Sequence, residues 1–181
     1  AHGWWTNEGK KISKSMGNTI DPNEMIDKYG LDQFRYFLIR EIPLGNDGDF
    51  SKEAFLNRIN SDLSNNLGNL IQRVMKFIYK NYDNRLPSKI DSTLDGYNLI
   101  KDGYDLLPFI DKKIENFEIS KCLEEIFIYV DKLNKFIDSN EPWKVFKVEK
   151  EKAGNGLSIL VETFRIVGIL LQPFTPNFST N

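Results

Sequence analysis

The sequence predicts a mainly α-helical protein that begins with a small β-hairpin. Apolar residues recur at helical spacing through most of residues 51–171, whereas short extended segments occur only within the first twenty residues. The composition, 40% hydrophobic and 28% charged, is ordinary for a soluble globular chain. The sequence has no internal repeat. We therefore expect a small α/β edge followed by an antiparallel helix bundle.

The N-terminal segment is typical of a hairpin. "HGWWT" and "KKIS" are short extended stretches, and the "NEG" between them supplies Asn7 and Gly9, which suit a turn. The chain begins in what reads as the middle of a strand and ends just after an apolar helix. We therefore expect it to be a fragment of a longer protein.

Two helices and a loop are predicted next. In "DPNEMIDKYG", Asp21 can cap a helix, Pro22 suits its first position and Gly30 can end it. "LDQFRYFLIRE" predicts a second helix directly afterwards. "PLGNDGDF", residues 43–50, is rich in turn-forming residues and is expected to be a loop that ends at Ser51, the cap of the next helix.

A long helix is predicted from Ser51 to about Tyr82. Its apolar residues share one face: Leu56, Ile59, Leu63, Leu67, Leu70, Ile71, Val74, Phe77 and Ile78. Its polar residues share the opposite face: Asp62, Asn66, Asn69, Arg73, Lys76 and Lys80. Gly68 indicates either close packing or a small bend. A loop is expected from residue 83 to about residue 94.

Three more long helices are predicted, at about 94–116, 119–138 and 151–171. The last is apolar nearly all round, so we expect it to run through the centre of the bundle. Between the last two, "SNEPWKVFK" contains Pro142, which suits the first turn of a short helix.

Charge and cysteine content exclude several classes of protein. The formal net charge of −2 argues against non-specific coating of nucleic acid, although it allows a local basic patch. A single cysteine, Cys122, excludes an internal disulfide framework and fits a cytoplasmic protein. The longest apolar run, residues 166–171, is far shorter than the roughly 20 residues of a membrane span, so no membrane partner is expected.

The segment "KKISKSMGN", residues 10–18, has the chemistry of a phosphate-binding loop. Lys11 and Lys14 can reach one polyphosphate as point charges, and the hydroxyls of Ser13 and Ser15 add hydrogen-bond donors. Such a loop would stabilise the charge that develops as pyrophosphate leaves the α-phosphorus of ATP. A solvated surface loop has the same composition, so these residues alone leave both interpretations open.

The flanking sequence resembles class I aminoacyl-tRNA synthetases. In "HGWWTNEGKKISKSMGNTIDP" a Lys-Met-Ser-Lys-Ser loop follows a strand and precedes Gly-Asn and a helix start, with Ile12 where methionine is usual. "KYGLDQFRYFLIRE" resembles the next family segment, with Leu31 where alanine is usual. The resemblance implies the edge of a Rossmann-type catalytic domain over residues 1–20. A stem-contact fold would then cover residues 21–50 and a helical anticodon-binding domain residues 51–181.

The same resemblance implies the residues of the nucleotide site. Lys11, Lys14, Ser13 and Ser15 match the family loop that acts on ATP. His2 and Trp4 match a family segment near the ATP site, although aromatic side chains in strands are more often part of a core.

The downstream helices resemble the anticodon-binding domain of the methionyl-tRNA synthetase family, on "NNLGNLIQRVMKFI" and "FIDSNEPWKVFK". This implies that Asn69, Arg73 and Trp143 read the CAU anticodon of tRNA(Met). Asn69 and Arg73 lie one turn apart, so both can address one ligand, and Trp143 offers a flat surface for a base. Without the family, the same residues would be an exposed helix face and a packing anchor.

The implied activity is ATP-dependent formation of methionyl-adenylate and transfer of methionine to tRNA. Mg²⁺ would accompany ATP with no ligand in this chain, zinc is expected only N-terminal to residue 1, and no metal site is predicted. We expect the isolated chain to be inactive, because the family's His-Ile-Gly-His motif and methionine pocket lie upstream.

Other interpretations stay open at this stage. The chain could belong to a cysteinyl, leucyl, isoleucyl or valyl enzyme, or to a non-catalytic helical tRNA-binding module. Lys76 and Lys80 could contact phosphates or only solvate the helix. Asp21, Asp27 and Asp32 are interpreted as caps and surface charges.

Overall fold

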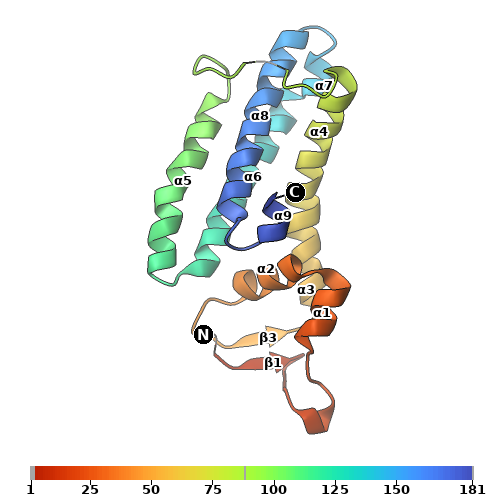
Figure 1. Ribbon diagram of the computed structural model, residues 1–181, viewed down its shortest axis with the longest axis vertical. Helices are drawn as coiled ribbons and strands as arrows, with labels where there is room; N and C mark the ends of the chain where they lie inside the picture. Colours follow the sequence, from red (N-terminus) through yellow and green to blue (C-terminus); the bar gives the residue numbers. More distant parts are fainter. Residues whose placement is uncertain (1–2, 88, 181) are drawn as a thin grey trace.

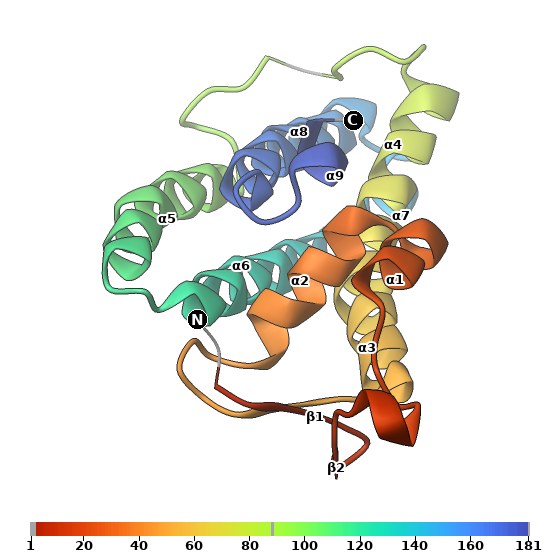
Figure 2. The ribbon, with the colours of Figure 1, turned by 60° about the horizontal axis from the view of Figure 1, so that its bottom comes forward.

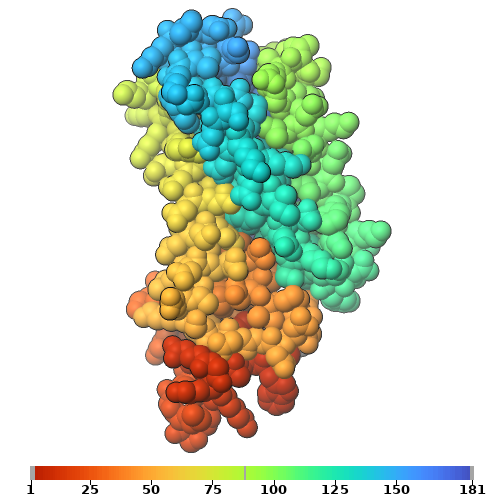
Figure 3. Space-filling view, turned by 180° about the vertical axis from the view of Figure 1, so that it is seen from behind, coloured from red at the N-terminus to blue at the C-terminus, as the bar shows by residue number. Residues whose placement is uncertain are grey.

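The computed structural model describes residues 3–87 and 89–180. The molecule is elongated, with a small sheet and two short helices at one end and a helix bundle extending from them (Figure 1). Seen from behind, the red N-terminal segment forms one end of the molecule and the blue and green segments form the other (Figure 3). The predicted fold class is confirmed.

The sheet contains one strand more than the sequence predicted. Its order is β2 (Lys10–Lys11), β1 (Trp5–Asn7) and β3 (Gly48–Phe50). The β1–β2 pair is antiparallel, which confirms the hairpin, whereas β3 pairs with β1 in parallel. The expectation of a loop over residues 43–50 is therefore wrong for its last three residues. Long-range pairing with β1 overrides the local turn preference.

Two helices follow the hairpin and precede β3, as predicted: α1 (Pro22–Tyr29) and α2 (Leu31–Glu41). The Asp21 carboxylate accepts a hydrogen bond of 2.8 Å from the Asn23 N–H, which confirms the cap. One side of α2 packs into a small aromatic core that contains Phe34, Phe37, Phe50 and Phe55. Tyr36 of the same helix is fully buried in the core of the bundle, so α2 joins the two cores.

The long helix runs as α3 (Lys52–Arg58), a π-helical segment η2 (Ile59–Gly68) and α4 (Asn69–Asn81). Ser51 accepts a hydrogen bond of 3.0 Å from the Ala54 N–H, so the predicted cap is confirmed. The long helical stretch predicted from Ser51 is confirmed, but its middle is π-helical rather than α-helical. A Cβ on Gly68 would lie 2.9 Å from the Leu63 carbonyl oxygen, so glycine permits this wider turn.

The bundle is completed by α5 (Tyr97–Glu115), α6 (Ile119–Asn140), α7 (Pro142–Val145), α8 (Lys150–Leu171) and α9 (Pro176–Thr180). In Figure 2 the helix α8 lies beside α5 and α6, and it also packs against α4 and α7. The central position predicted for it is confirmed. The start of α5 is later than predicted because Gly96 adopts a left-handed φ of 85°.

Among the described residues, α8 alone is long and apolar enough to span a membrane. Because 56% of that stretch is buried inside the bundle, its apolar character is that of a core helix.

Asp32 corrects an expectation, because it is not a surface charge. Its side chain is only 5% exposed, and it accepts a hydrogen bond of 2.6 Å from the Phe178 N–H in α9. Arg35, one turn later on α2, donates to the carbonyls of Pro173 and Phe174 at 3.0 and 3.2 Å. These contacts fix the C-terminal end of the bundle to α2, the helix that precedes β3.

Candidate functional site

The signature loop, residues 10–18, projects from the sheet at one end of the molecule. After β2 the chain forms a single 3₁₀ turn, η1 (Lys14–Met16), which ends at Gly17. Gly17 has φ 65° and ψ 16°, and its N–H donates to the Lys14 carbonyl at 3.2 Å. This left-handed conformation favours glycine, which explains the glycine two residues after the motif.

Asn18 closes the loop with its side-chain amide. The oxygen of the amide accepts a hydrogen bond of 2.9 Å from the Ser13 N–H, and its nitrogen donates to the Lys11 carbonyl at 3.0 Å. The Asn7 side chain donates to the Asn18 carbonyl at 2.8 Å, which links the loop to strand β1. Neither asparagine was predicted to hold the loop, although Asn7 was assigned to the hairpin turn and the Gly-Asn pair was part of the resemblance.

The side chains predicted to act on ATP are accessible. Lys11, Lys14 and Ser15 are exposed, Ser13 is half-buried, and the two serine hydroxyls lie 2.7 Å apart. Within the part of the chain that the structure describes, no ion pair involves Lys11 or Lys14. Two cations and two hydroxyls on one short loop form a donor set that suits a polyphosphate.

Of the two N-terminal candidates for the ATP site, His2 and Trp4, the structure describes only Trp4. His2 lies outside the described residues. The side chain of Trp4 is 80% exposed, so Trp4 does not belong to the core, where aromatic side chains of strands usually lie. Its backbone N–H donates to the Asp47 carboxylate at 2.7 Å.

Among the described residues, no three or more His, Cys, Asp or Glu side chains form a group that could hold a metal ion.

At the other end of the molecule, helices α4 and α7 line an open groove of about 490 Å³. We call it the α4–α7 groove, and its lining residues are Arg73, Lys76, Phe77, Lys80 and Trp143. The Arg73 guanidinium lies 5.9 Å from the centre of the Trp143 ring. Two of the three predicted anticodon residues therefore meet. The third, Asn69, is exposed one turn earlier on α4 and does not line the groove.

Helix α6 holds Arg73 in place. The Arg73 guanidinium donates to Asp138 at 3.1 Å and to Asn134 at 3.3 Å. Asn134 in turn donates to the Asn66 side chain at 2.7 Å. Asn134 and Asp138 were not predicted from the sequence. Their spacing of one helical turn was visible in the sequence, but the facing of α6 toward α4 is a tertiary feature.

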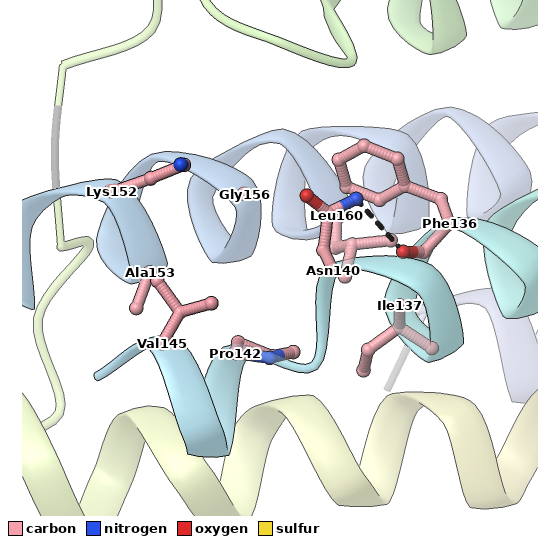
Figure 4. Close-up of a pocket in the computed structure, with 9 residues that line it drawn as sticks. All are labelled: Phe136, Ile137, Asn140, Pro142, Val145, Lys152, Ala153, Gly156 and Leu160. Atoms are coloured by element: carbon pink, nitrogen blue, oxygen red, sulfur yellow. Dashed lines mark hydrogen bonds between the residues drawn. The ribbon is translucent and has the colours of Figure 1, made fainter. Parts of the chain in front are cut away.

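Trp143 is positioned by the packing behind it. Pro142 and Val145 of α7 line a small cavity with residues of α6 and α8 (Figure 4). At about 20 Å³ this cavity has room for one water molecule and none for a base. Trp143 itself is half-buried against the bundle core. It is therefore a packing anchor that also presents part of its surface to the groove.

The rim of the groove is cationic and aromatic. Lys76 and Lys80 are exposed one turn apart, and Phe77 between them packs edge-to-face on Phe146 with ring centres 5.5 Å apart. The Lys150 ammonium lies 5.5 Å from the centre of the Phe146 ring. A negatively charged chain with flat bases complements such a surface.

A polar network lies between the two sites, where α2 meets η2. The Tyr36 hydroxyl donates to Asp62 at 2.7 Å, and Arg58 lies 3.7 Å from the same carboxylate. Burial, followed by the bond to Asp62, raises the pKa of Tyr36 above its ordinary value. The hydroxyl therefore stays protonated and remains a donor to Asp62.

Comparison with known proteins gives the same enzyme family for both parts of the chain. Residues 1–75 match the family model described as tRNA synthetases class I (M), so the loop and sheet belong to a class I aminoacyl-tRNA synthetase. Residues 86–181 match the model described as the anticodon binding domain of methionyl tRNA ligase. The chain therefore belongs to the methionyl-tRNA synthetase family.

Individual relatives agree with this assignment. The chain is 46% identical over 180 residues to the methionine–tRNA ligase of Rickettsia felis, covering 98% of this chain and 35% of the relative. It is 44% identical to that of Caldanaerobacter subterraneus, covering 97% of this chain and 28% of the relative.

A solved structure gives the same result. The structure of Mycobacterium tuberculosis methionyl-tRNA synthetase in complex with methionyl-adenylate superimposes with a TM-score of 0.92 at 35% identity. The match covers 99% of this chain and 36% of that one. The chain thus spans about a third of the length of the relatives it matches.

Proposed function

We propose that the chain is the part of a methionine–tRNA ligase that supplies the ATP loop and the anticodon groove. The observation that carries this proposal is the meeting of Arg73 and Trp143 on one groove, within a chain of this family. Residues 1–20 would form the catalytic edge, residues 21–50 the stem-contact fold and residues 51–181 the anticodon-binding domain. The setting would be the cytoplasm, in keeping with the buried free thiol of Cys122.

In the proposed reaction a carboxylate oxygen of methionine attacks the α-phosphorus of ATP. The bond from that phosphorus to its bridging oxygen breaks, and its electron pair leaves with pyrophosphate. The ammonium groups of Lys11 and Lys14 stabilise this growing negative charge, and the hydroxyls of Ser13 and Ser15 donate hydrogen bonds. His2 and Trp4 remain candidates for contacts with the nucleotide. Mg²⁺ would neutralise part of the phosphate charge, bound by groups outside the described residues.

The α4–α7 groove would read the CAU anticodon of tRNA(Met). An unstacked base would lie on the exposed part of Trp143, and Arg73, already held by Asn134 and Asp138, would address its edge. Asn69, one turn along α4, would reach a neighbouring base from outside the groove. The family assignment favours this anticodon over those of the cysteinyl, leucyl, isoleucyl and valyl enzymes.

The test is a binding competition with anticodon stem-loops. A CAU stem-loop should bind the chain more tightly than loops with unrelated anticodons, and Asn69→Ala, Arg73→Ala or Trp143→Ala should each weaken it. Equal affinity for all loops would contradict the proposed anticodon reading.

The catalytic half of the proposal needs the full-length protein that carries this chain. That protein should catalyse methionine-dependent ATP–pyrophosphate exchange, whereas the isolated chain should not. A full-length protein that binds tRNA(Met) without any exchange activity would instead be a non-catalytic tRNA-binding protein.

A further inference from the structure

We propose that Asn18 is a positioning residue for adenylate formation. Its side chain sets the shape of the signature loop so that Lys11 and Lys14 address one polyphosphate, although it touches no substrate itself. This inference rests on the function proposed for the loop, and it assigns a role to a residue outside the five-residue motif.

The Asn18 side-chain amide bonds to the loop backbone as a peptide group bonds to a neighbouring strand, through one acceptor and one donor. One planar amide accepts from the Ser13 N–H at 2.9 Å and donates to the Lys11 carbonyl at 3.0 Å. The two bonded groups flank Ile12, at the start of the motif, whereas Asn18 lies beyond its end. A single side chain therefore ties the two ends of the loop together.

The bridge is itself fixed to the sheet. The Asn7 amide donates to the Asn18 carbonyl at 2.8 Å, and Asn7 belongs to β1, paired on one side with β2 and on the other with β3. Asp49, from β3, accepts a hydrogen bond of 2.8 Å from the Gly9 N–H in the hairpin turn. The backbone of the loop is therefore held in the frame of the sheet, while both lysine side chains extend into solvent.

This arrangement separates two properties that the reaction needs. The ammonium groups must move to meet the phosphates, but the backbone from which they extend must stay fixed. Without the Asn18 amide, the Ser13 N–H and the Lys11 carbonyl can bond to water instead, so the loop gains other conformations. Misplacement of a charged group by about 1 Å can cost on the order of 100-fold in rate. In the proposed mechanism these groups act on the phosphates of ATP, so a displaced loop should affect the reaction step rather than methionine binding.

The experiment uses the full-length protein and methionine-dependent ATP–pyrophosphate exchange. Asn18→Ala should lower kcat by roughly 10- to 100-fold and leave the KM for methionine unchanged. In a Lys11→Ala/Lys14→Ala background the same substitution should have an effect of less than about 2-fold, because Asn18 acts through these two lysines. Asn7→Ala should lower kcat by a smaller factor.

The matched control is Asn23→Ala. Asn23 is an exposed asparagine near the loop, and its backbone N–H, which bonds to Asp21, is retained in the variant. This variant should have wild-type kinetics. Amide hydrogen exchange gives a second readout, since in Asn18→Ala the faster exchange should be confined to residues 10–18.

The outcomes separate this inference from the proposed function. A Lys14→Ala enzyme with full activity would overturn the proposed role of the loop, and the inference with it. A weak Lys14→Ala enzyme together with a fully active Asn18→Ala enzyme would overturn the inference alone. A loss on Asn18→Ala that persists in full in the background without Lys11 and Lys14, or faster exchange that extends through α1 and the bundle, would also overturn it.

Discussion

The signature loop and the α4–α7 groove are built by different means. The loop is held by hydrogen bonds between residues at most eleven positions apart, from Asn7 to Asn18, and its functional side chains are exposed. In the groove, Arg73 is held by Asp138 and Trp143 by core packing, through contacts between distant helices. In the loop, therefore, the lysine side chains can move while the backbone stays in place. The shape of the groove depends instead on how the helices pack together.

The largest expected effect separates the two sites most clearly. Lys14→Ala in the full-length protein should lower the kcat of ATP–pyrophosphate exchange by about 10²–10³-fold, the size of effect seen when one donor to a developing charge is removed. Its affinity for a CAU stem-loop should not change. The neighbouring Lys10→Ala is the control and should keep its activity. Weakened stem-loop binding by Lys14→Ala would show that the two sites are not independent.

The reverse pattern is expected from the groove. Trp143→Ala should weaken binding of the CAU stem-loop by about 1–3 kcal/mol, because a stacking surface is lost. Arg73→Ala should cost a similar amount and relax the preference for CAU. Trp4→Ala, which removes an exposed tryptophan at the other end of the molecule, is the matched control. An equal loss in that variant would argue against base stacking on Trp143.

A third prediction concerns the junction between the two regions. Tyr36→Phe should lower the free energy of unfolding at pH 7 by about 1 kcal/mol, because Asp62 loses a hydrogen-bond donor. The raised pKa of Tyr36 means that only the unfolded chain releases its proton just above pH 10. Wild-type stability should therefore fall above pH 10, by about 1.4 kcal/mol per pH unit for this group.

The Phe variant lacks this proton, so the difference in stability between the two proteins should narrow above pH 10. Urea unfolding of both proteins at several pH values measures it. A difference that stays constant to pH 11 would contradict the shift.

The smallest effects are expected from Lys76 and Lys80. If each contacts a phosphate, Lys76→Ala and Lys80→Ala should weaken binding of every stem-loop alike. Each should also reduce the slope of log affinity against log salt by about 1. Lys112→Ala, at an exposed position on α5 away from the groove, should leave the slope unchanged. An unchanged slope in the groove variants would leave the two lysines as solvating residues only.

Local signals in the sequence predicted local structure well. Asp21 and Ser51 cap the helices that their residue types indicated, and Pro142 begins the short helix α7. The predictions were wrong where contacts between distant parts of the chain determine the local structure. Residues 48–50 became a strand because β1 is available to pair with them, and Asp32 became buried because α9 places an N–H beside it.

The candidate sites follow the same division. Lys11, Lys14, Arg73 and Trp143 could be proposed from motifs, because the family resemblance marks residue types along the sequence. The residues that hold these side chains in place could not be proposed in this way. Asn134 and Asp138 contact Arg73 only because the fold brings α6 beside it. The π-helical turns of η2 have no signal in the sequence except Gly68.

The contacts of α2 with the C-terminal end of the bundle have a consequence for the order of folding. Asp32 and Arg35 bond to residues 173–178, which lie nearly at the other end of the chain. During synthesis on a ribosome, α2 therefore emerges long before its partners exist. The hydrogen bonds of Asp32 and Arg35 can form only after almost the whole bundle has been translated. Docking of α2 should therefore be a late and slow event in folding.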